Sequence, residues 1–124
     1  MANQYLSDIH TLVIHCSATP EGKDFHASDI DRWHRDRGWS MIGYHGVICL
    51  DGSWEDGRPW TRRGAHVAGN NKNTLGFCLI GGLDKNGKAK NTFGYDQFST
   101  LRSKIIEVKS RCVNLKEVRG HRSY

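Results

Sequence analysis

The sequence predicts an α/β fold, with a single domain in which helices flank a mixed central β-sheet. Apolar stretches of strand length alternate along the chain with two amphipathic helical patterns. The 124 residues suffice for one hydrophobic core. No internal repeat and no low-complexity segment interrupts the pattern.

The first predicted strand lies within residues 11–19 and organises the rest of the prediction. Residues 11–14 are apolar or β-branched without a break, which is typical of a strand buried on both faces. His15 ends this run, and the small residues 16–18 let the chain leave the sheet. An imidazole held in this way suits a metal ligand or a proton-transfer group. For a lone histidine, a core position bonded to a backbone carbonyl is the usual alternative.

The first helix is expected to begin at Ser28 as N-cap, with Asp31 as its acidic capping partner. Gly38 supplies the left-handed residue that ends it. Trp33 should pack on the sheet, and His34 is interpreted as a packed or solvated helix residue rather than a ligand. The helix is predicted because four residues recur at intervals of one helical turn: Ile30, Trp33, His34 and Arg37.

Two further strands are expected at residues 43–50 and 53–55, joined by the hairpin signal Asp51-Gly52. A long loop then runs through residue 69 and contains His66. Residues 75–80 form another buried strand, followed by a polar turn at 84–88.

The last long element is a helix from about residue 95 to residue 112. Its apolar residues recur every three or four positions and form one face: Phe98, Leu101, Ile105, Val108 and Cys112. Residues 115–119 then form a short strand that delivers Gly120 and His121.

Composition limits the function classes. A net charge of +5 favours an anionic partner, but no block of five or six basic residues is present, so direct nucleic-acid binding is the weakest reading. No apolar run approaches the ~20 residues of a membrane span, and the N-terminus lacks the pattern of a signal peptide. The four cysteines lie far apart, which predicts reduced thiols in a protein made in the cytosol.

Two histidines lie at the ends of predicted strands: His15 ends one strand, and His121 follows another. If the two strands are neighbours, both imidazoles lie at one edge of the sheet. Zinc binds neutral imidazole, and catalytic zinc sites use three protein ligands and a water molecule. The spacing alone is weak evidence, because neither HExxH nor CxxC is present.

Six motifs in order carry a family resemblance that extends from about residue 12 to residue 121. They are VIHCSAT, RWHRDRGWSMIGYHGVI, DGSWEDGR, GAHVAGNNKNTLGFCLIGG, LRS and VRGH. The chain therefore resembles the zinc-dependent N-acetylmuramoyl-L-alanine amidases, a family that includes the peptidoglycan recognition proteins. Within the family, the short phage lysozymes of amidase type are the most similar.

The resemblance implies a role for four residues. His15 and His121 look like the first two zinc ligands. Tyr44 looks like the tyrosine that hydrogen-bonds the substrate carbonyl or the developing oxyanion, and a core aromatic residue is its alternative. His66 looks like the cleft histidine that contacts the stem peptide or the sugar, and a solvated loop residue is its alternative. His45 points away from Tyr44 on the strand and is assigned to packing.

The implied reaction is hydrolysis of the amide between N-acetylmuramic acid and L-alanine of the stem peptide, with one zinc ion activating water. A basic surface suits the polyanionic bacterial wall. The resemblance implies an endolysin made without a signal peptide in the host bacterial cytoplasm, acting on the cell wall after release. We expect a monomer whose partner is peptidoglycan.

The end of the sequence departs from the family pattern. In the family, a third zinc ligand (Asp or Cys) and a catalytic lysine follow the second histidine, whereas this sequence ends at Tyr124. We therefore expect residues 1–124 to be a single amidase-like domain that lacks the family's C-terminal segment and binds zinc loosely. The purified chain should then carry substoichiometric zinc and show little or no amidase activity. The alternative is a non-catalytic module that binds peptidoglycan or a protein such as phage RNA polymerase, because some phage lysozymes of this family also bind that polymerase.

Overall fold

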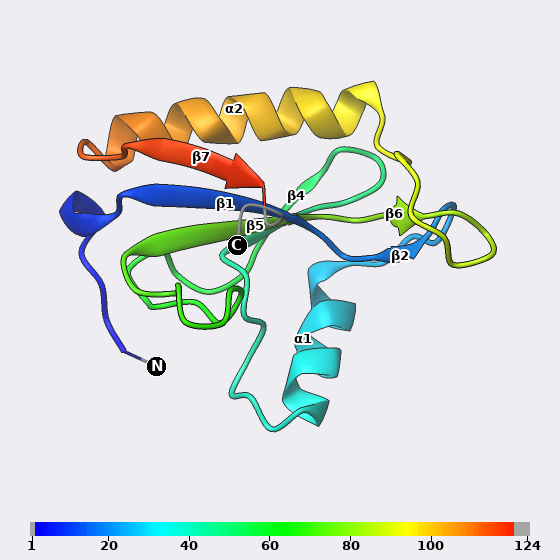
Figure 1. The fold of residues 1–124 in the computed structure, drawn as a ribbon, viewed down its shortest axis with the longest axis horizontal. Coiled ribbons are helices and arrows are strands. Elements are labelled where there is room, and N and C mark those ends of the chain that lie inside the picture. Colours follow the sequence, from blue (N-terminus) through cyan, green and yellow to red (C-terminus); the bar gives the residue numbers. More distant parts are fainter. Residues whose placement is uncertain (1, 121–124) are drawn as a thin grey trace.

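The computed structural model describes residues 2–120. A five-stranded sheet has the order β4-β3-β5-β1-β7 (Figure 1). Neighbouring strands are parallel except for the antiparallel hairpin of β3 and β4. The expected mixed sheet is therefore confirmed, with these strands: β1 Thr11–Cys16, β3 Gly46–Ile48, β4 Trp54–Asp56, β5 Thr74–Leu79 and β7 Glu117–Gly120.

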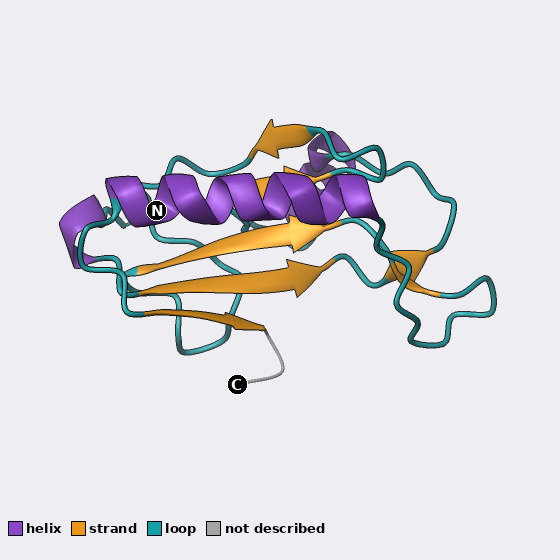
Figure 2. Ribbon diagram, turned by 90° about the horizontal axis from the view of Figure 1, so that it is seen from above, coloured by secondary structure: helices purple, strands orange, loops and turns teal. Residues whose placement is uncertain are grey.

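Two helices cover opposite faces of this sheet. Helix α2 (Tyr95–Arg111) lies along one face, and α1 (Ala27–Asp36) lies on the other (Figures 1 and 2). A short 3₁₀ helix, Leu6–Asp8, precedes β1. Strands β2 (Thr19–Pro20) and β6 (Gly82–Leu83) form a separate two-stranded sheet. The predicted single α/β domain with flanking helices is confirmed, and no helix within residues 2–120 is long and apolar enough to cross a bilayer.

Strand β5 supplies residues to the core on both faces of the sheet, and all six of its residues are buried. Phe77 packs with Leu12 and with Val108 of α2. Cys78 packs on the other face with Val47 and with Ile30 of α1. Because both faces are covered by helices, β5 has the continuous apolar run that the sequence displays.

The start of α1 corrects one prediction. The N-cap is His26, not Ser28, and the backbone N–H of His26 donates to Asp29 Oδ2 at 2.8 Å. Asp31 lies inside the helix and accepts a hydrogen bond from the backbone N–H of Ile42 at 2.8 Å. The helix begins two residues earlier than predicted because Asp29 and Glu55 accept the backbone N–H groups of His26 and Ala27. The expected glycine stop is confirmed, since Gly38 has a φ of 90°.

The buried face of α2 also differs from the prediction at its first turn. Phe98 is 46% exposed, whereas Gln97 is 1% exposed. The side-chain amide of Gln97 donates to the backbone carbonyls of Ile80 (3.0 Å) and Ile48 (3.4 Å). An amide is preferred over an aromatic ring here because it gives the Ile80 carbonyl, next to the end of β5, a donor. The Ile48 carbonyl already accepts the backbone N–H of Ile80.

Core packing by Phe77 leads to a stability prediction. Phe77→Ala removes a fully buried ring that contacts Trp54 and Trp60, so the free energy of unfolding should fall by about 3–5 kcal/mol. Phe98→Ala is the matched control and should cost less than about 1 kcal/mol, since that ring is half exposed. Urea denaturation of both variants measures the difference. Similar losses for the two would show that Phe77 is not a core residue.

Candidate functional site

His15 is held by backbone pairing on both sides of its strand. It lies on β1, opposite Cys78 of β5, and its side chain is almost wholly buried. On the other side of β1, β7 pairs Gly120 with Ile14. Gly120 and Ile14 are the residues before His121 and His15, and His121 itself lies outside the described residues.

His66 is brought against His15 from the long loop after β4. His15 Nε2 lies 2.8 Å from His66 Nδ1, and the two rings meet edge to face with centroids 5.0 Å apart. His66 Nε2 lies 3.1 Å from Thr74 Oγ1. The Thr74 hydroxyl donates to backbone carbonyls of Asn70 and Asn71, so its oxygen accepts the Nε2–H of His66. His66 Nδ1 is then the acceptor for the Nε2–H of His15.

Two glycines make room for the His66 ring. A Cβ atom at Gly76 would lie 2.5 Å from His66 Cγ, and one at Gly64 would lie 2.6 Å from His66 Cδ2. The Asn71 side chain fixes the loop, because its Oδ1 accepts the backbone N–H groups of His66 and Val67, each at 2.9 Å. The motif GAHVAGNN therefore encodes the space for the ring and the residue that holds its backbone.

Tyr44 stands beside the same pair. Its ring centroid lies 5.1 Å from that of His15 and 5.6 Å from that of His34. Burial raises the pKa of Tyr44 well above its usual value, and the neighbouring Cys78 thiol adds to the effect. The hydroxyl therefore keeps its proton at neutral pH, which is the state that can donate a hydrogen bond.

A cleft of about 300 Å³ opens over this group. Tyr44 and His66 line it together with three polar residues, His34, Arg37 and Asn71. Arg37, at the end of α1, adds a positive charge suited to an acidic ligand. The sequence analysis had counted Arg37 only for its helical spacing and had not singled out Asn71, because neither belongs to a metal or nucleophile motif.

Two other histidines near the cleft act in packing, as expected. His34 Nδ1 accepts the backbone N–H of Gly43 at 2.8 Å, and burial lowers the pKa of His34. His45 is fully buried, accepts the backbone N–H of Gly76 on Nδ1 (3.0 Å) and pairs through Nε2 with the carbonyl of Arg62 (2.7 Å). These contacts require the neutral imidazole form.

The described residues also contain a group of three side chains with metal-binding atoms that the sequence analysis missed. These are His26, Cys49 and Glu55. They lie 23 and 29 residues apart along the chain, on a helix start, a turn and a strand, so no short motif links them. The four cysteines are free, as expected, and Cys16 is the exposed one.

Comparisons with curated proteins and with solved structures found relatives of this chain. No family model matches the chain. The endolysin of Klebsiella phage KP32 is 40% identical over 98 residues, which are 79% of this chain and 65% of that protein. The chain thus spans slightly less than two thirds of that relative.

Solved structures agree with this relationship. The bumblebee peptidoglycan recognition protein PGRP-SA has a TM-score of 0.80 at 29% identity, over 98% of this chain and 75% of that one. The N-acetylmuramoyl-L-alanine amidase LysC from Clostridium intestinale also has a TM-score of 0.80, over 99% of this chain and 76% of that one. The two sequences are 24% identical, so this similarity shows a shared fold.

His45 generates a pH prediction. Burial lowers the pKa of His45 to about 4, whereas an unfolded histidine titrates near 6.5. Between these values the unfolded state binds more protons, so the His45 contribution is complete above about pH 6.5 and is lost as the pH falls toward 4. The loss should reach about 3 kcal/mol. Urea unfolding between pH 4 and pH 7 measures it, and an NMR titration of His45 with a midpoint near 6.5 would contradict it.

Proposed function

The chain belongs to the family of N-acetylmuramoyl-L-alanine amidases and peptidoglycan recognition proteins, and from this premise we propose that it is a phage endolysin. Its proposed reaction is hydrolysis of the amide between N-acetylmuramic acid and L-alanine of the stem peptide. The bond from water oxygen to the carbonyl carbon forms, and the bond from that carbon to the alanine nitrogen breaks. The nitrogen leaves as an amine after taking a proton.

The observation that carries the proposal is the contact of His15 with His66 beside Tyr44, next to the cleft. Neutral imidazole is a preferred zinc ligand, and the contacts of His66 with His15 and Thr74 hold the two rings in place. The donor chemistry of His15 therefore fits zinc. The parallel pairing of Ile14 with Gly120 supports His121 as a second ligand.

Zinc held by His15 and His121 would polarise the scissile carbonyl and lower the pKa of a bound water molecule toward 7. The remaining work falls to side chains of this chain. Tyr44 is proposed to donate its hydroxyl proton in a hydrogen bond to the substrate carbonyl oxygen as negative charge develops there. His66 lines the cleft and is proposed to contact the stem peptide or the sugar, while its Nδ1 orients the His15 ring.

Peptidoglycan is the proposed partner because the chain is similar to peptidoglycan recognition proteins and carries a positive net charge. The net charge of +5 favours the anionic bacterial wall. Arg37 in the cleft offers a contact for a carboxylate, a group that stem peptides carry. In this proposal the protein is made in the host cytoplasm and acts on the cell wall as a monomer.

Release of dye from labelled, insoluble peptidoglycan tests this function. The protein with added zinc should release dye, a chelator should stop the release, and zinc should restore it. Pull-down on the same material separates the alternatives: a chain that sediments with peptidoglycan but releases nothing is a non-catalytic wall-binding module. A chain that does neither points to a protein partner such as phage RNA polymerase, and the amidase proposal fails.

Tyr44→Phe provides a residue-level prediction. The variant loses one hydroxyl group, so its free energy of unfolding should change by less than about 1 kcal/mol. Dye release should fall on the order of 10²-fold, the usual cost of one lost oxyanion donor. The matched control is Tyr95→Phe, because Tyr95 is 84% exposed. Unchanged release by Tyr44→Phe would remove Tyr44 from the mechanism.

A further inference from the structure

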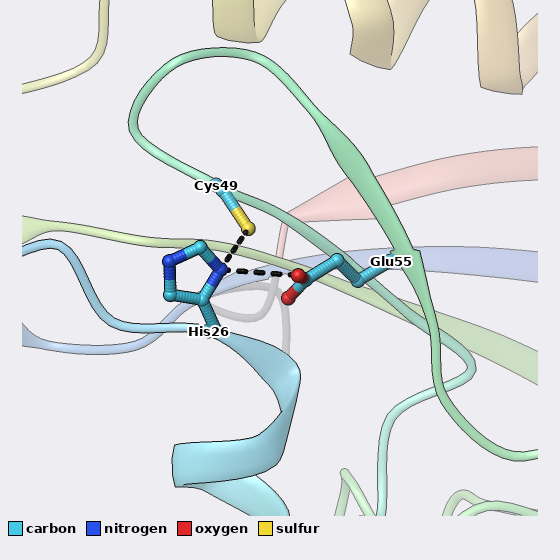
Figure 3. Close-up of side chains that lie close together, drawn as sticks. All are labelled: His26, Cys49 and Glu55. Atoms are coloured by element: carbon cyan, nitrogen blue, oxygen red, sulfur yellow. Dashed lines mark hydrogen bonds and ion pairs between the residues drawn. The ribbon is translucent and has the colours of Figure 1, made fainter.

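A second group of chemically reactive side chains lies at the start of α1. The Nδ1 atom of His26 is 3.0 Å from Glu55 Oε2 and 3.5 Å from Cys49 Sγ (Figure 3). One ligand atom from each residue lies within 4.8 Å of the others. Figure 3 shows the imidazole, the thiol and the carboxylate pointing toward one another from three separate segments.

The fold brings the three residues together through the β3–β4 hairpin. Cys49 follows β3, and Glu55 lies on β4 beyond the turn in which Gly52 has a φ of 86°. The second carboxylate oxygen of Glu55 accepts the backbone N–H of Ala27 at 2.7 Å. The hairpin therefore anchors the first turn of α1. His26, the N-cap of α1, lies next to the hairpin.

We propose that His26, Cys49 and Glu55 form a binding site for one zinc ion, separate from the cleft of His15. The donor set of one imidazole, one thiolate and one carboxylate is a zinc set. Tetrahedral zinc with ordinary bond lengths places nitrogen and sulfur ligands about 3.6 Å apart, and nitrogen and oxygen ligands about 3.4 Å apart. The observed separations of 3.5 Å and 3.0 Å need only small side-chain adjustments.

Charge and access also suit a divalent cation. A thiolate and a carboxylate together balance the two charges of Zn²⁺. The Cys49 side chain is buried, whereas His26 and Glu55 are 39% and 35% exposed, so an ion can enter from the solvent side. The same side leaves room for a water molecule as fourth ligand.

The surroundings of His26 are those of a metal-binding histidine. Its other ring nitrogen, Nε2, lies 3.4 Å from Asp24 Oδ2. Histidine ligands of zinc commonly donate this second N–H to a carboxylate, which orients the ring and makes the bound nitrogen more basic. Without an ion, the Nδ1–H of His26 donates to Glu55 Oε2, and this hydrogen bond raises the pKa of His26. A zinc ion would displace that proton and bind the same nitrogen, with the other proton kept on Nε2.

A nucleophilic cysteine fits these contacts less well. In a Cys–His–acid relay, the ring nitrogen near the thiol takes the thiol proton, and Asp24 on Nε2 would be the acid. Here Glu55 Oε2 lies closer to Nδ1 (3.0 Å) than Cys49 Sγ does (3.5 Å), so Nδ1 is engaged by a carboxylate. Burial also raises the pKa of Cys49 to about 12, which disfavours a free thiolate. Convergence on one nitrogen is the arrangement of ligands around a shared ion.

An ion in this position would have a structural role. It would join the start of α1 to the β3–β4 hairpin, and α1 carries His34 and Arg37 of the cleft. Zinc at this site should therefore raise the thermal stability of the chain whether or not the chain hydrolyses peptidoglycan.

Cobalt substitution tests the site directly, since Co²⁺ bound to a thiolate gives a charge-transfer absorption in the near ultraviolet. The metal-free 124-residue chain titrated with Co²⁺ should show this band, and Zn²⁺ should displace it. Cys49→Ser should abolish the band, and the control Cys112→Ser should retain it, because Cys112 packs in the other core cluster. His15→Asn should also retain it. Loss of the band in His15→Asn, or its persistence in Cys49→Ser, would overturn the site.

Three milder variants keep the test valid if Cys49→Ser folds poorly. Glu55→Gln and His26→Asn should each weaken Zn²⁺ binding about 100-fold or more, and Asp24→Asn about 10-fold. Zinc should raise the melting temperature of the parent and of Cys112→Ser, with a smaller rise for Glu55→Gln. Absence of the cobalt band in the parent, or equal zinc affinity in the parent, Glu55→Gln and His26→Asn, would show that no such site exists.

Discussion

The 2.8 Å contact between His15 Nε2 and His66 Nδ1 is the interaction on which the candidate site depends. His15 cannot move far, because β1 is paired on both sides, with β5 and with β7. His66 cannot move far either, because its ring fills the space left by Gly64 and Gly76. The contact therefore joins β1 to the loop at the cleft.

The loop itself is fixed by buried polar groups. Arg58 is 6% exposed, and its guanidinium donates to the backbone carbonyls of Ile42 (Nε, 2.8 Å) and Arg63 (Nη1, 2.8 Å). His45 binds the strand at Gly76 and the loop at Arg62. Such groups are costly to bury unless their hydrogen bonds are made, so they favour one loop conformation over the alternatives. A rigid sheet and a rigid loop together hold Tyr44 and His66 at the same cleft.

The sequence analysis predicted the parts of the fold whose patterns are local. The apolar run of β1, the buried run of β5 and the periodicity of α2 each report burial, which dominates the choice of secondary structure. His15 was identified because it ends a buried strand. The N-cap of α1 and the burial of Gln97 were missed because both depend on partners distant in sequence, Glu55 and the carbonyls at the strand ends. The His26, Cys49 and Glu55 group was missed for the same reason, since only the tertiary fold brings the three together.

Mass spectrometry of the soluble products from purified peptidoglycan tests the central claim most directly. The account predicts free stem peptides that begin with an unblocked L-alanine, together with glycan strands whose N-acetylmuramic acid carries a free lactyl carboxylate. Both should fall on the order of 10²-fold with Tyr44→Phe and should disappear with chelation of zinc. Products cut within the glycan strand or between peptide residues, with the amide to L-alanine intact, would contradict it.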